Sequence, residues 1–429
     1  MKKISILSVF ILALAFICGC AHISDPDSLS EPSAGTSDTA SVSEDIAQEK
    51  QTEPETLFEG DFGAPKASRT GVKDGEYFTV DDIEEGFTEE RDGMIFLDVS
   101  ANELLEIGGL VRPSENNGEY YRLNALNRQE YSVLNEALAS NPAGGTIRFR
   151  TNADRIAVDI KLYAVPLDFK HFAERGICGI DVYVGTGTDR SYCGGPMQFM
   201  TDTEELFDVI ELPEGYNEVM IEMPQYAGVS WFYIGFPEGS EIAAPTERTN
   251  EPILFYGSSI TQGASTGRPG NAYTNILCRA LDCDCINLGF SSSDFGEQAI
   301  AEYITTRDFA VFVMDYNNNA SVDQLRETHY DFYKTVRDAR EDVPILFLTK
   351  PYYTQIRDEE TALKEKIILE TFNRAKNEGD KNVYFISSSE YFPEEQRNLY
   401  TIDMIHPNDL GHYYMAKTIF PVLYQIING

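Results

Sequence analysis

A serine at the end of an apolar segment and a histidine near the carboxyl terminus could together form a nucleophilic site. Residues 253–257 read Ile-Leu-Phe-Tyr-Gly and are followed directly by Ser258 and Ser259. Near the carboxyl terminus of the chain, Asp403 lies three residues before His406. A serine hydroxyl needs a base to accept its proton, and the base needs a carboxylate to orient it. Ser259, His406 and Asp403 could fill these three roles.

The same mechanism needs hydrogen-bond donors for the negatively charged oxygen of the tetrahedral intermediate. The backbone N–H groups of Ser259 and Gly289 and the side-chain amide of Asn319 could supply them, since each residue follows an apolar segment typical of a strand. Ligands of open α/β sheets bind beyond the carboxyl ends of the strands. The reaction needs no metal ion and no organic cofactor, so we predict neither.

Alternative interpretations of four residues stay open at this point. Ser259 could simply cap the helix that follows its strand, which is a common use of serine. Asp315 also follows an apolar segment and is the alternative orienting acid. Arg268 could line a pocket or fix a loop, and His171 could approach the site from the first half of the chain.

The second half of the chain, residues 246–429, alternates apolar segments with amphipathic ones. Strands buried on both faces and joined by helices form a parallel sheet between helical layers. We therefore predict a three-layer α/β/α domain with a five-stranded parallel sheet. The expected strands are 253–257, 285–290, 309–316, 344–350 and 383–388, and helices are expected at 272–281, 297–305 and 359–377.

Residues 71–245 have a different pattern, in which short segments alternate apolar and polar residues between Gly, Pro, Asn and Asp. This pattern predicts an antiparallel β-sandwich domain. One helical insert is expected at 128–140, with Tyr131, Leu134 and Leu138 on one face. The expected strands include 144–151, 154–163, 179–185, 217–224 and 230–236.

The first 19 residues have the layout of an export signal, because two lysines precede an apolar segment that is too short for a comfortable membrane span. With Gly19 before Cys20, the segment resembles a bacterial lipoprotein signal, which implies a mature chain that begins at a lipid-carrying Cys20. A plain secretion signal or an uncleaved anchor is the alternative. We expect an extracytoplasmic protein held at the cell membrane by its lipid alone, through a disordered acidic linker over 20–70 rich in Ser, Thr and Pro.

The composition of the chain restricts which partners it can bind. The chain has 34 basic and 70 acidic residues, a formal net charge of −36, which argues against nucleic acid because phosphate binding needs clusters of Lys and Arg. Cys178 and Cys193 could form a disulfide in an oxidising compartment. The other cysteines of the second half are expected to be buried thiols rather than metal ligands. His329 is expected to be solvated, and His412 to pack or lie at the surface of the last helix.

Four segments of the second half resemble the conserved blocks of the SGNH, or GDSL-type, hydrolases. They are Gly-Ser-Ser-Ile-Thr-Gln-Gly from 257, Asn-Leu-Gly-Phe-Ser from 287, Asp-Tyr-Asn-Asn-Asn from 315 and Asp-Met-Ile-His-Pro-Asn from 403. Their order along the chain makes the resemblance specific. The resemblance implies that Ser259 is the nucleophile and that Gly289 supplies an oxyanion amide. Ser258 replaces the aspartate that is more common before the nucleophile.

The third block departs most from the family pattern, because three asparagines compete for the oxyanion role. The Asp-x-x-x-Asn spacing of the relevant subgroup selects Asn319 over Asn317 and Asn318. The last block fits closely and implies Asp403 and His406 as acid and base.

Residues 179–185, Gly-Ile-Asp-Val-Tyr-Val-Gly, are similar to the Gly-x-Asp-Leu-Tyr signature of an N-terminal β-domain fused to such hydrolases. Two-domain carbohydrate esterases with a jelly roll and an SGNH domain have the same layout. The resemblance implies a jelly-roll-like sandwich and a serine esterase that removes acetyl or other short acyl groups, with an acetylated carbohydrate or another small ester as substrate. A catalytically inactive surface carbohydrate-binding protein is one alternative. An SGNH lipase, thioesterase or acyltransferase is the other.

Overall fold

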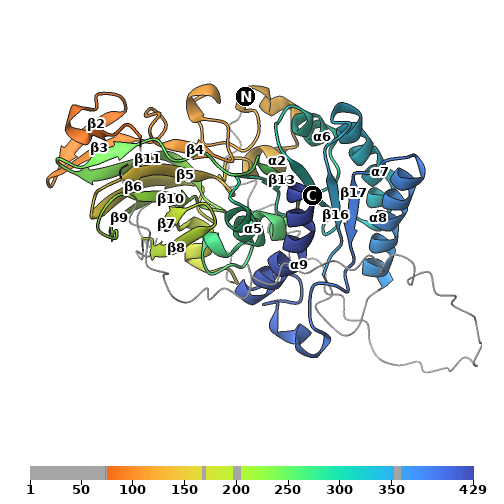
Figure 1. Cartoon of the computed structure of the whole chain (residues 1–429). Helices are drawn as coiled ribbons and strands as arrows, with labels where there is room; N and C mark the ends of the chain where they lie inside the picture. The colour runs from red at the N-terminus through yellow and green to blue at the C-terminus, as the bar shows by residue number, and fades with distance from the viewer. Residues whose placement is uncertain (1–72, 74, 167–170, 197–203, 352–358) are drawn as a thin grey trace, which may run out of the picture.

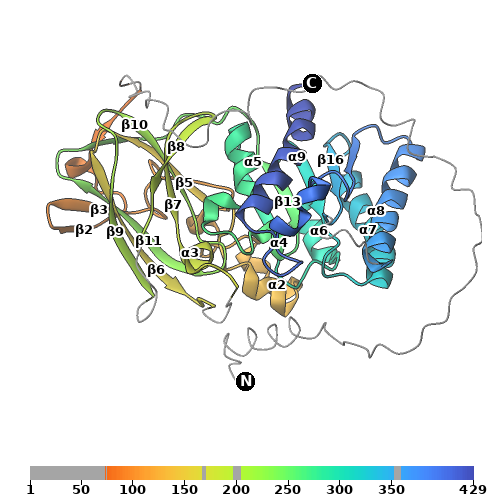
Figure 2. The same ribbon diagram turned by 90° about the horizontal axis from the view of Figure 1, so that it is seen from below.

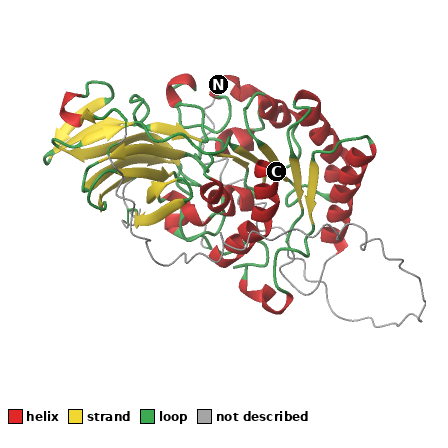
Figure 3. Cartoon of the chain, viewed as in Figure 1, coloured by secondary structure: helices red, strands yellow, loops and turns green. Residues whose placement is uncertain are grey.

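The computed structural model describes residues 73, 75–166, 171–196, 204–351 and 359–429. The predicted export signal, Cys20 and the linker over 20–70 lie outside these residues. Within the described part of the chain, no helix combines the length and the apolar character needed to cross a membrane. Figures 1 and 3 show that strands fill one end of the molecule, whereas at the other end helices surround a separate set of strands.

The first domain is a sandwich of two antiparallel sheets, as predicted. One sheet has the order β1-β12-β5-β10-β7-β8, with β4 paired to β5, and the other has the order β2-β3-β11-β6-β9. The strands of the first sheet are β1 (Phe78–Thr79), β4 (Glu106–Gly108), β5 (Thr146–Thr151), β7 (Asp181–Thr186), β8 (Asp189–Gly194), β10 (Asn217–Glu222) and β12 (Glu241–Ala243). Those of the second are β2 (Phe87–Arg91), β3 (Met94–Asp98), β6 (Arg155–Tyr163), β9 (Glu205–Glu211) and β11 (Gly228–Pro237).

Alternating side chains build the core of the sandwich. Ile147 and Phe149 of β5 face the same buried cluster as Val158 of β6 and Phe232 of β11. Successive side chains of a strand point to opposite faces, so one face of each sheet reaches this cluster. Apart from the helical insert, the short helices in the described part of this domain are η1 (Val80–Asp82), η2 (Pro113–Glu115) and α3 (Glu174–Cys178).

The disulfide considered between Cys178 and Cys193 is absent from the structure, where both carry free thiols. The Cys178 thiol donates to the backbone oxygen of Glu174 at 3.2 Å, inside α3. The Cys193 thiol lies 3.7 Å from the backbone oxygen of Ser191, on β8. Each sulfur therefore contacts backbone groups and not the other sulfur.

The second domain has a five-stranded parallel sheet of order β14-β13-β15-β16-β17, which confirms the predicted three-layer fold. Helices α5 and α9 pack on one face, and α6, α7 and α8 form the layer on the other (Figure 1). The strands are β13 (Ile253–Gly257), β14 (Cys285–Gly289), β15 (Val311–Asp315), β16 (Ile345–Leu348) and β17 (Val383–Ile386). The helices are α4 (Ser259–Gln262), η4 (Pro269–Asn271), α5 (Tyr273–Leu281), α6 (Gln298–Thr305), α7 (Val322–Ala339), α8 (Glu359–Asn377), η5 (Glu394–Leu399) and α9 (Asp409–Asn428).

Two histidines of this domain are buried. His329 was expected to be solvated, and this prediction is wrong: it is fully buried, with its Nδ1 2.9 Å from the hydroxyl of Thr371. Burial lowers its pKa to about 3. His412 is a packing residue, because its Nε2–H donates to the backbone oxygen of Ala264 at 3.0 Å.

The predicted helical insert is two shorter helices, η3 (Ala125–Glu130) and α2 (Val133–Leu138). Tyr131 separates them, because its backbone is extended, with φ of −94° and ψ of 155°. The insert packs on the second domain: Leu138 of α2 belongs to the same buried cluster as Leu254 of β13 and Leu288 of β14.

Asp181, in the Gly-x-Asp-x-Tyr segment of β7, joins the two domains. Its buried carboxylate accepts hydrogen bonds from Arg268 Nη1 at 2.6 Å and from the backbone N–H of Gly270 at 2.8 Å. The hydroxyl of Tyr183 accepts a second bond from Arg268 Nη1, also at 2.6 Å. Arg268 thus fixes the loop after α4 to the sandwich. Asp181 and Tyr183 of the segment are therefore structural residues that link the two domains.

Candidate active site

The turn from β13 into α4 presents Ser259 at the carboxyl end of the parallel sheet. Ser258 caps α4, since its side-chain oxygen accepts from the backbone N–H of Ile260 at 3.2 Å. Gly263 ends the helix in the left-handed region, with φ of 108°, and a Cβ there would lie 2.3 Å from Nε2 of Gln225. Capping is therefore the role of Ser258, and the hydroxyl of Ser259 remains available for chemistry.

The structure brings Ser259, His406 and Asp403 together in one chain of contacts. Ser259 Oγ lies 3.0 Å from His406 Nε2, and His406 Nδ1 lies 2.7 Å from Asp403 Oδ2. His406 lies in the loop that an isolated bridge between Thr401 and Pro407 closes, shortly before the start of α9. This short, bridged segment keeps the imidazole beside α4, although Ser259 is 147 residues away in sequence.

The carboxylate of Asp403 is held in its charged form. Its Oδ1 accepts from the backbone N–H of His406 at 2.7 Å and of Ile405 at 2.9 Å. Burial alone would raise the pKa of Asp403, but the bonds from the His406 ring and from these two backbone groups outweigh it and hold the pKa below its ordinary value. An ionised carboxylate at Nδ1 favours the imidazole tautomer whose Nε2 can accept the proton of Ser259.

Asp315, the alternative acid, has other partners. It is buried and accepts from the hydroxyls of Thr261 and Tyr273, each at 2.8 Å. Burial raises its pKa to about 6, against the effect of these two bonds. Asp315 therefore ties α4 and α5 to the end of β15, and Asp403 is the carboxylate that contacts His406.

The backbone N–H of Gly289, a predicted oxyanion donor, already has a hydrogen-bond partner in the structure. Its backbone N–H donates to the side-chain oxygen of Asn287 at 2.8 Å, and an amide has only one hydrogen to give. Glycine is required here for space, because a Cβ would lie 2.3 Å from the backbone nitrogen of Gln262. The end of β14 thus packs directly on α4, and that close approach explains the glycine.

Two other backbone donors stand free beside α4. The N–H groups of Ser259 and Ser292 make no hydrogen bond with any described residue. Ser292 has φ of 58°, in the left-handed region, and the N–H of its neighbour Ser291 donates to Gln262 Oε1 at 3.0 Å. The loop after β14 therefore lies against α4. Sequence reasoning missed Ser292, because nothing in three consecutive serines marks which one takes this conformation.

Asn319 lies on the β14 side of its loop, where its amide donates a short hydrogen bond to the buried carboxylate of Asp294. Burial, together with the charges of Asp315 and Glu297, raises the pKa of Asp294. One N–H of the Asn319 amide is used in this way and the second remains. Asn317 instead donates toward the backbone oxygen of Leu348, on β16, at 3.4 Å.

The sandwich domain, which Figure 2 shows beside the hydrolase domain, contributes side chains to the site. Tyr226 donates its hydroxyl to the backbone oxygen of Ser259 at 3.2 Å. The ring of Phe172 lies 5.2 Å from that of Tyr226 and 5.8 Å from that of His406. His171 lies 5.7 Å from the His406 ring, and its Nε2 is 4.0 Å from Asp403 Oδ2.

His171, Asp403 and His406 also have the side chains of a metal site, and their ligand atoms lie within 4.8 Å of one another. However, His406 Nδ1 and Asp403 Oδ2 already share a hydrogen at 2.7 Å. A metal on these atoms would separate the pair and leave Ser259 without an oriented base. The contact between His406 and Asp403 therefore fits an oriented base better than a pair of metal ligands.

Comparisons with known proteins identify both domains. Residues 250–424 match the model of the GDSL-like Lipase/Acylhydrolase family, and residues 94–242 match that of the N-terminus of Esterase_SGNH_hydro-type proteins. A comparison with curated proteins found no match.

Solved structures share the two-domain fold. A Bacteroides ovatus protein described as a GDSL-like lipase is 25% identical, with a TM-score of 0.69 over 78% of this chain and 98% of its own. A salicylyl-acyltransferase from a tetracycline biosynthetic pathway has 16% identity and a TM-score of 0.64, over 77% and 96%. A family two carbohydrate esterase from Cellvibrio japonicus has 12% identity and a TM-score of 0.51, over 78% and 98%. The protein is an esterase whose second domain belongs to the GDSL-like lipase/acylhydrolase family and whose first domain is the N-terminal region of SGNH-type esterases.

Proposed function

We propose that this esterase hydrolyses acetyl or other short acyl esters of carbohydrates through an acyl-enzyme. The observation that carries the mechanism is the continuous contact from Ser259 Oγ through His406 to Asp403, at 3.0 and 2.7 Å. Ser259 attacks the ester carbonyl while His406 Nε2 accepts its proton. The imidazolium then donates this proton to the departing alcohol oxygen, and Asp403 stabilises the positive charge.

Water completes the cycle. His406 removes a proton from the water molecule as it attacks the acyl group, and the proton returns to Ser259 as the acid leaves. The free backbone N–H groups of Ser259 and Ser292, with the remaining amide hydrogen of Asn319, are the candidate donors to the oxyanion. Each step uses side chains or backbone groups of this chain, with no metal ion or organic cofactor.

The carbohydrate part of the proposal has its support in the sandwich domain and in the carbohydrate esterase of similar fold. Tyr226, Phe172 and His171 give the site a wall from outside the hydrolase domain. The net charge of −36 favours a neutral substrate over an acidic one.

Activity on an aryl acetate tests the mechanism. Ser259→Ala and His406→Ala should each lower kcat by three orders of magnitude or more, as removal of a triad member generally does. Ser258→Ala is the matched control, because it removes the neighbouring hydroxyl and only a helix cap, at a cost of about 1 kcal/mol in stability. Full activity in either of the first two variants would exclude the proposed roles.

A binding protein without activity is the rival hypothesis, and a fluorophosphonate probe separates the two. The esterase predicts labelling of the folded wild type that disappears in Ser259→Ala and after heat denaturation. A folded protein that retains an oligosaccharide but takes no label would support the rival instead.

We also propose that the enzyme works outside the cytoplasm, held by a lipid on Cys20. The support is the lysine-led apolar segment before Gly19 and Cys20. Cys20→Ser should move the protein from the membrane fraction to the soluble one and abolish labelling with radioactive fatty acid. An unchanged distribution would contradict the lipid anchor.

A further inference from the structure

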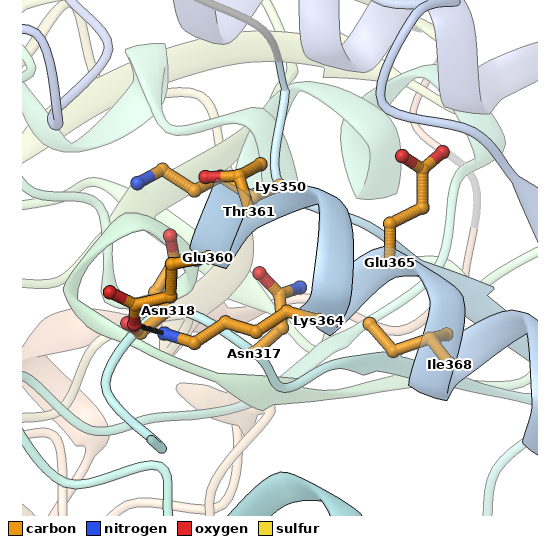
Figure 4. A pocket seen from close by; sticks show the side chains of 8 residues that line it. All are labelled: Asn317, Asn318, Lys350, Glu360, Thr361, Lys364, Glu365 and Ile368. Carbon is orange, nitrogen blue, oxygen red and sulfur yellow. Dashed lines mark hydrogen bonds and ion pairs between the residues drawn. The ribbon is translucent and has the colours of Figure 1, made fainter. Parts of the chain in front are cut away.

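A polar cavity lies in the hydrolase domain, beside the loop that carries Asn319 (Figure 4). Its volume is about 170 Å³, several times the volume of about 30 Å³ that one water molecule takes in the liquid. Only one of its lining side chains, Ile368, is aliphatic throughout. The cavity is lined by Asn317, Asn318, Lys350, Glu360, Thr361, Lys364, Glu365 and Ile368.

The cavity shares the ligand-binding edge of the sheet with Ser259. Asn317 follows the end of β15, and Lys350 follows the end of β16. β15 is the direct neighbour of β13, which leads to Ser259, and β16 is the next strand along. Because neighbouring strands are about 4.8 Å apart, the two strand ends that border the cavity lie one and two strand spacings, roughly 5 and 10 Å, from the strand end that leads to Ser259. A group attached to a substrate in the active site can span that distance.

Unpaired buried oxygens on two of the lining residues point to a ligand that donates hydrogen bonds. Asn317 is 1% exposed, and its side-chain oxygen has no hydrogen-bond partner in the described structure. The side-chain oxygen of Asn318 is also buried without a partner there. A buried acceptor left unpaired has lost its hydration without compensation, and a bound donor would restore a hydrogen bond to it.

The charges of the cavity balance. Lys364, which is 9% exposed, pairs with Glu360 at 2.7 Å and extends toward the backbone oxygen of Asn318 at 3.4 Å. With Lys350 and Glu365, the lining carries two cations and two carboxylates. A charged ligand would meet one pair of like charges, whereas a neutral hydroxyl can donate to a carboxylate or an amide oxygen and accept from an ammonium group.

We propose that this cavity is a subsite for a neutral, hydroxyl-rich group, namely a sugar ring adjoining the one that carries the ester. The inference rests on the proposed function, since it gives the carbohydrate a second point of attachment. Hydroxyl groups of the ring donate to the side-chain oxygens of Asn317 and Asn318 and accept from Lys364. The subsite selects for chain length and leaves the chemistry at Ser259 unchanged.

Two measurements on the mature chain test the subsite. The first is calorimetric binding of cellohexaose, xylohexaose and mannohexaose, and the second is kcat/KM for an aryl acetate too small to reach the cavity. Lys364→Met removes the ammonium group and keeps the length of the side chain. Lys366→Met is the matched control, because this exposed lysine is on the same helix outside the cavity. Lys350→Met provides a second subsite variant should Lys364→Met fail to fold.

We expect at least one hexasaccharide to bind the wild type and Lys366→Met equally, and Lys364→Met about tenfold more weakly, as loss of a charge-assisted hydrogen bond implies. Aryl acetate hydrolysis should stay within twofold in all variants. Equal saccharide affinity in wild type and Lys364→Met overturns the proposal, as does hydrolysis of the aryl acetate by a wild type that binds none of the three saccharides. If saccharide binding depends on Lys364 but no ester is hydrolysed, the subsite stands and the proposed catalytic function fails.

Discussion

Replacing Asp403 with asparagine changes one atom at the centre of the proposed mechanism and leaves the local backbone supported. Oδ1 of Asp403 accepts from the backbone N–H groups of Ile405 and His406, and an amide oxygen can accept both. Oδ2, 2.7 Å from His406 Nδ1, becomes an NH₂ group that can only donate. Nδ1 must then act as the acceptor, so the ring proton moves to Nε2, the atom 3.0 Å from Ser259 Oγ. A protonated Nε2 cannot accept the serine proton.

The expected loss is therefore catalytic. A base held in the wrong tautomer lowers kcat by roughly 10³ to 10⁴. At about 1.4 kcal/mol for each factor of ten, this corresponds to about 4 to 5.5 kcal/mol of transition-state stabilisation. KM should change little, because the carboxylate acts through His406.

The assay is aryl acetate hydrolysis, with thermal unfolding as the measure of folding. Asp409→Asn is the control, since it removes the same charge six residues later, where the carboxylate accepts from the backbone N–H of Gly267 at 2.7 Å. We expect the control to keep at least a third of wild-type activity. If Asp403→Asn retains more than a tenth of wild-type kcat while folded, Asp403 does not set the tautomer of His406.

The pH dependence of stability has a definite sign at Asp403. Its pKa is lowered in the folded protein, so the carboxylate stabilises the fold at pH values above its ordinary pKa. This contribution is lost as the pH falls through the lowered value. Unfolding of Asp403→Asn should consequently depend less on pH in the acid range than unfolding of the wild type.

Three further substitutions test the parts that support the site. Asp181→Asn removes the charge partner of Arg268 and should lower the free energy of unfolding in urea by about 2 kcal/mol. This is less than the 3–5 kcal/mol typical of a fully buried pair, because the Arg268 side chain is partly exposed. An unchanged urea midpoint would contradict the link. Ser292→Gly should raise the free energy of unfolding by about 1 kcal/mol, because φ of 58° strains serine and not glycine. The variant should keep full activity, since the backbone N–H remains. A large loss of activity would show that the Ser292 side chain takes part in the reaction. Tyr226→Phe should lower kcat severalfold through one lost hydrogen bond of about 1 kcal/mol to the Ser259 carbonyl, and an unchanged kcat would show that this bond does not position the turn.

The elements of the fold were predictable where one pattern dominates a segment. Each strand of the parallel sheet is a continuous apolar segment, because both of its faces are covered, and all five lie at the expected places. Helix α8 begins and ends at the predicted residues, Glu359 and Asn377. His329 escaped prediction because its burial depends on Tyr316 and Thr371, which reach it from other elements.

The candidate site was predictable only in part for a related reason. A motif fixes which residue follows a strand, so Ser259, Asp403 and His406 could be named from their types and spacing. It does not fix where an individual N–H points. The N–H of Gly289 was predicted to face the oxyanion, whereas in the structure it donates to the side-chain oxygen of Asn287. Which of several adjacent residues faces the site is decided by local backbone angles, as the left-handed Ser292 shows.

The contribution of the sandwich could not be seen from either half alone, because it depends on how the domains dock. Asp181 and Tyr183 fix Arg268, and therefore the loop that leaves α4, to the first domain. The same docking lets Tyr226 bond the carbonyl of Ser259 and places Phe172 against the ring of His406. A shift between the domains would therefore disturb both the nucleophile and the base. On this reasoning the two domains form one catalytic unit.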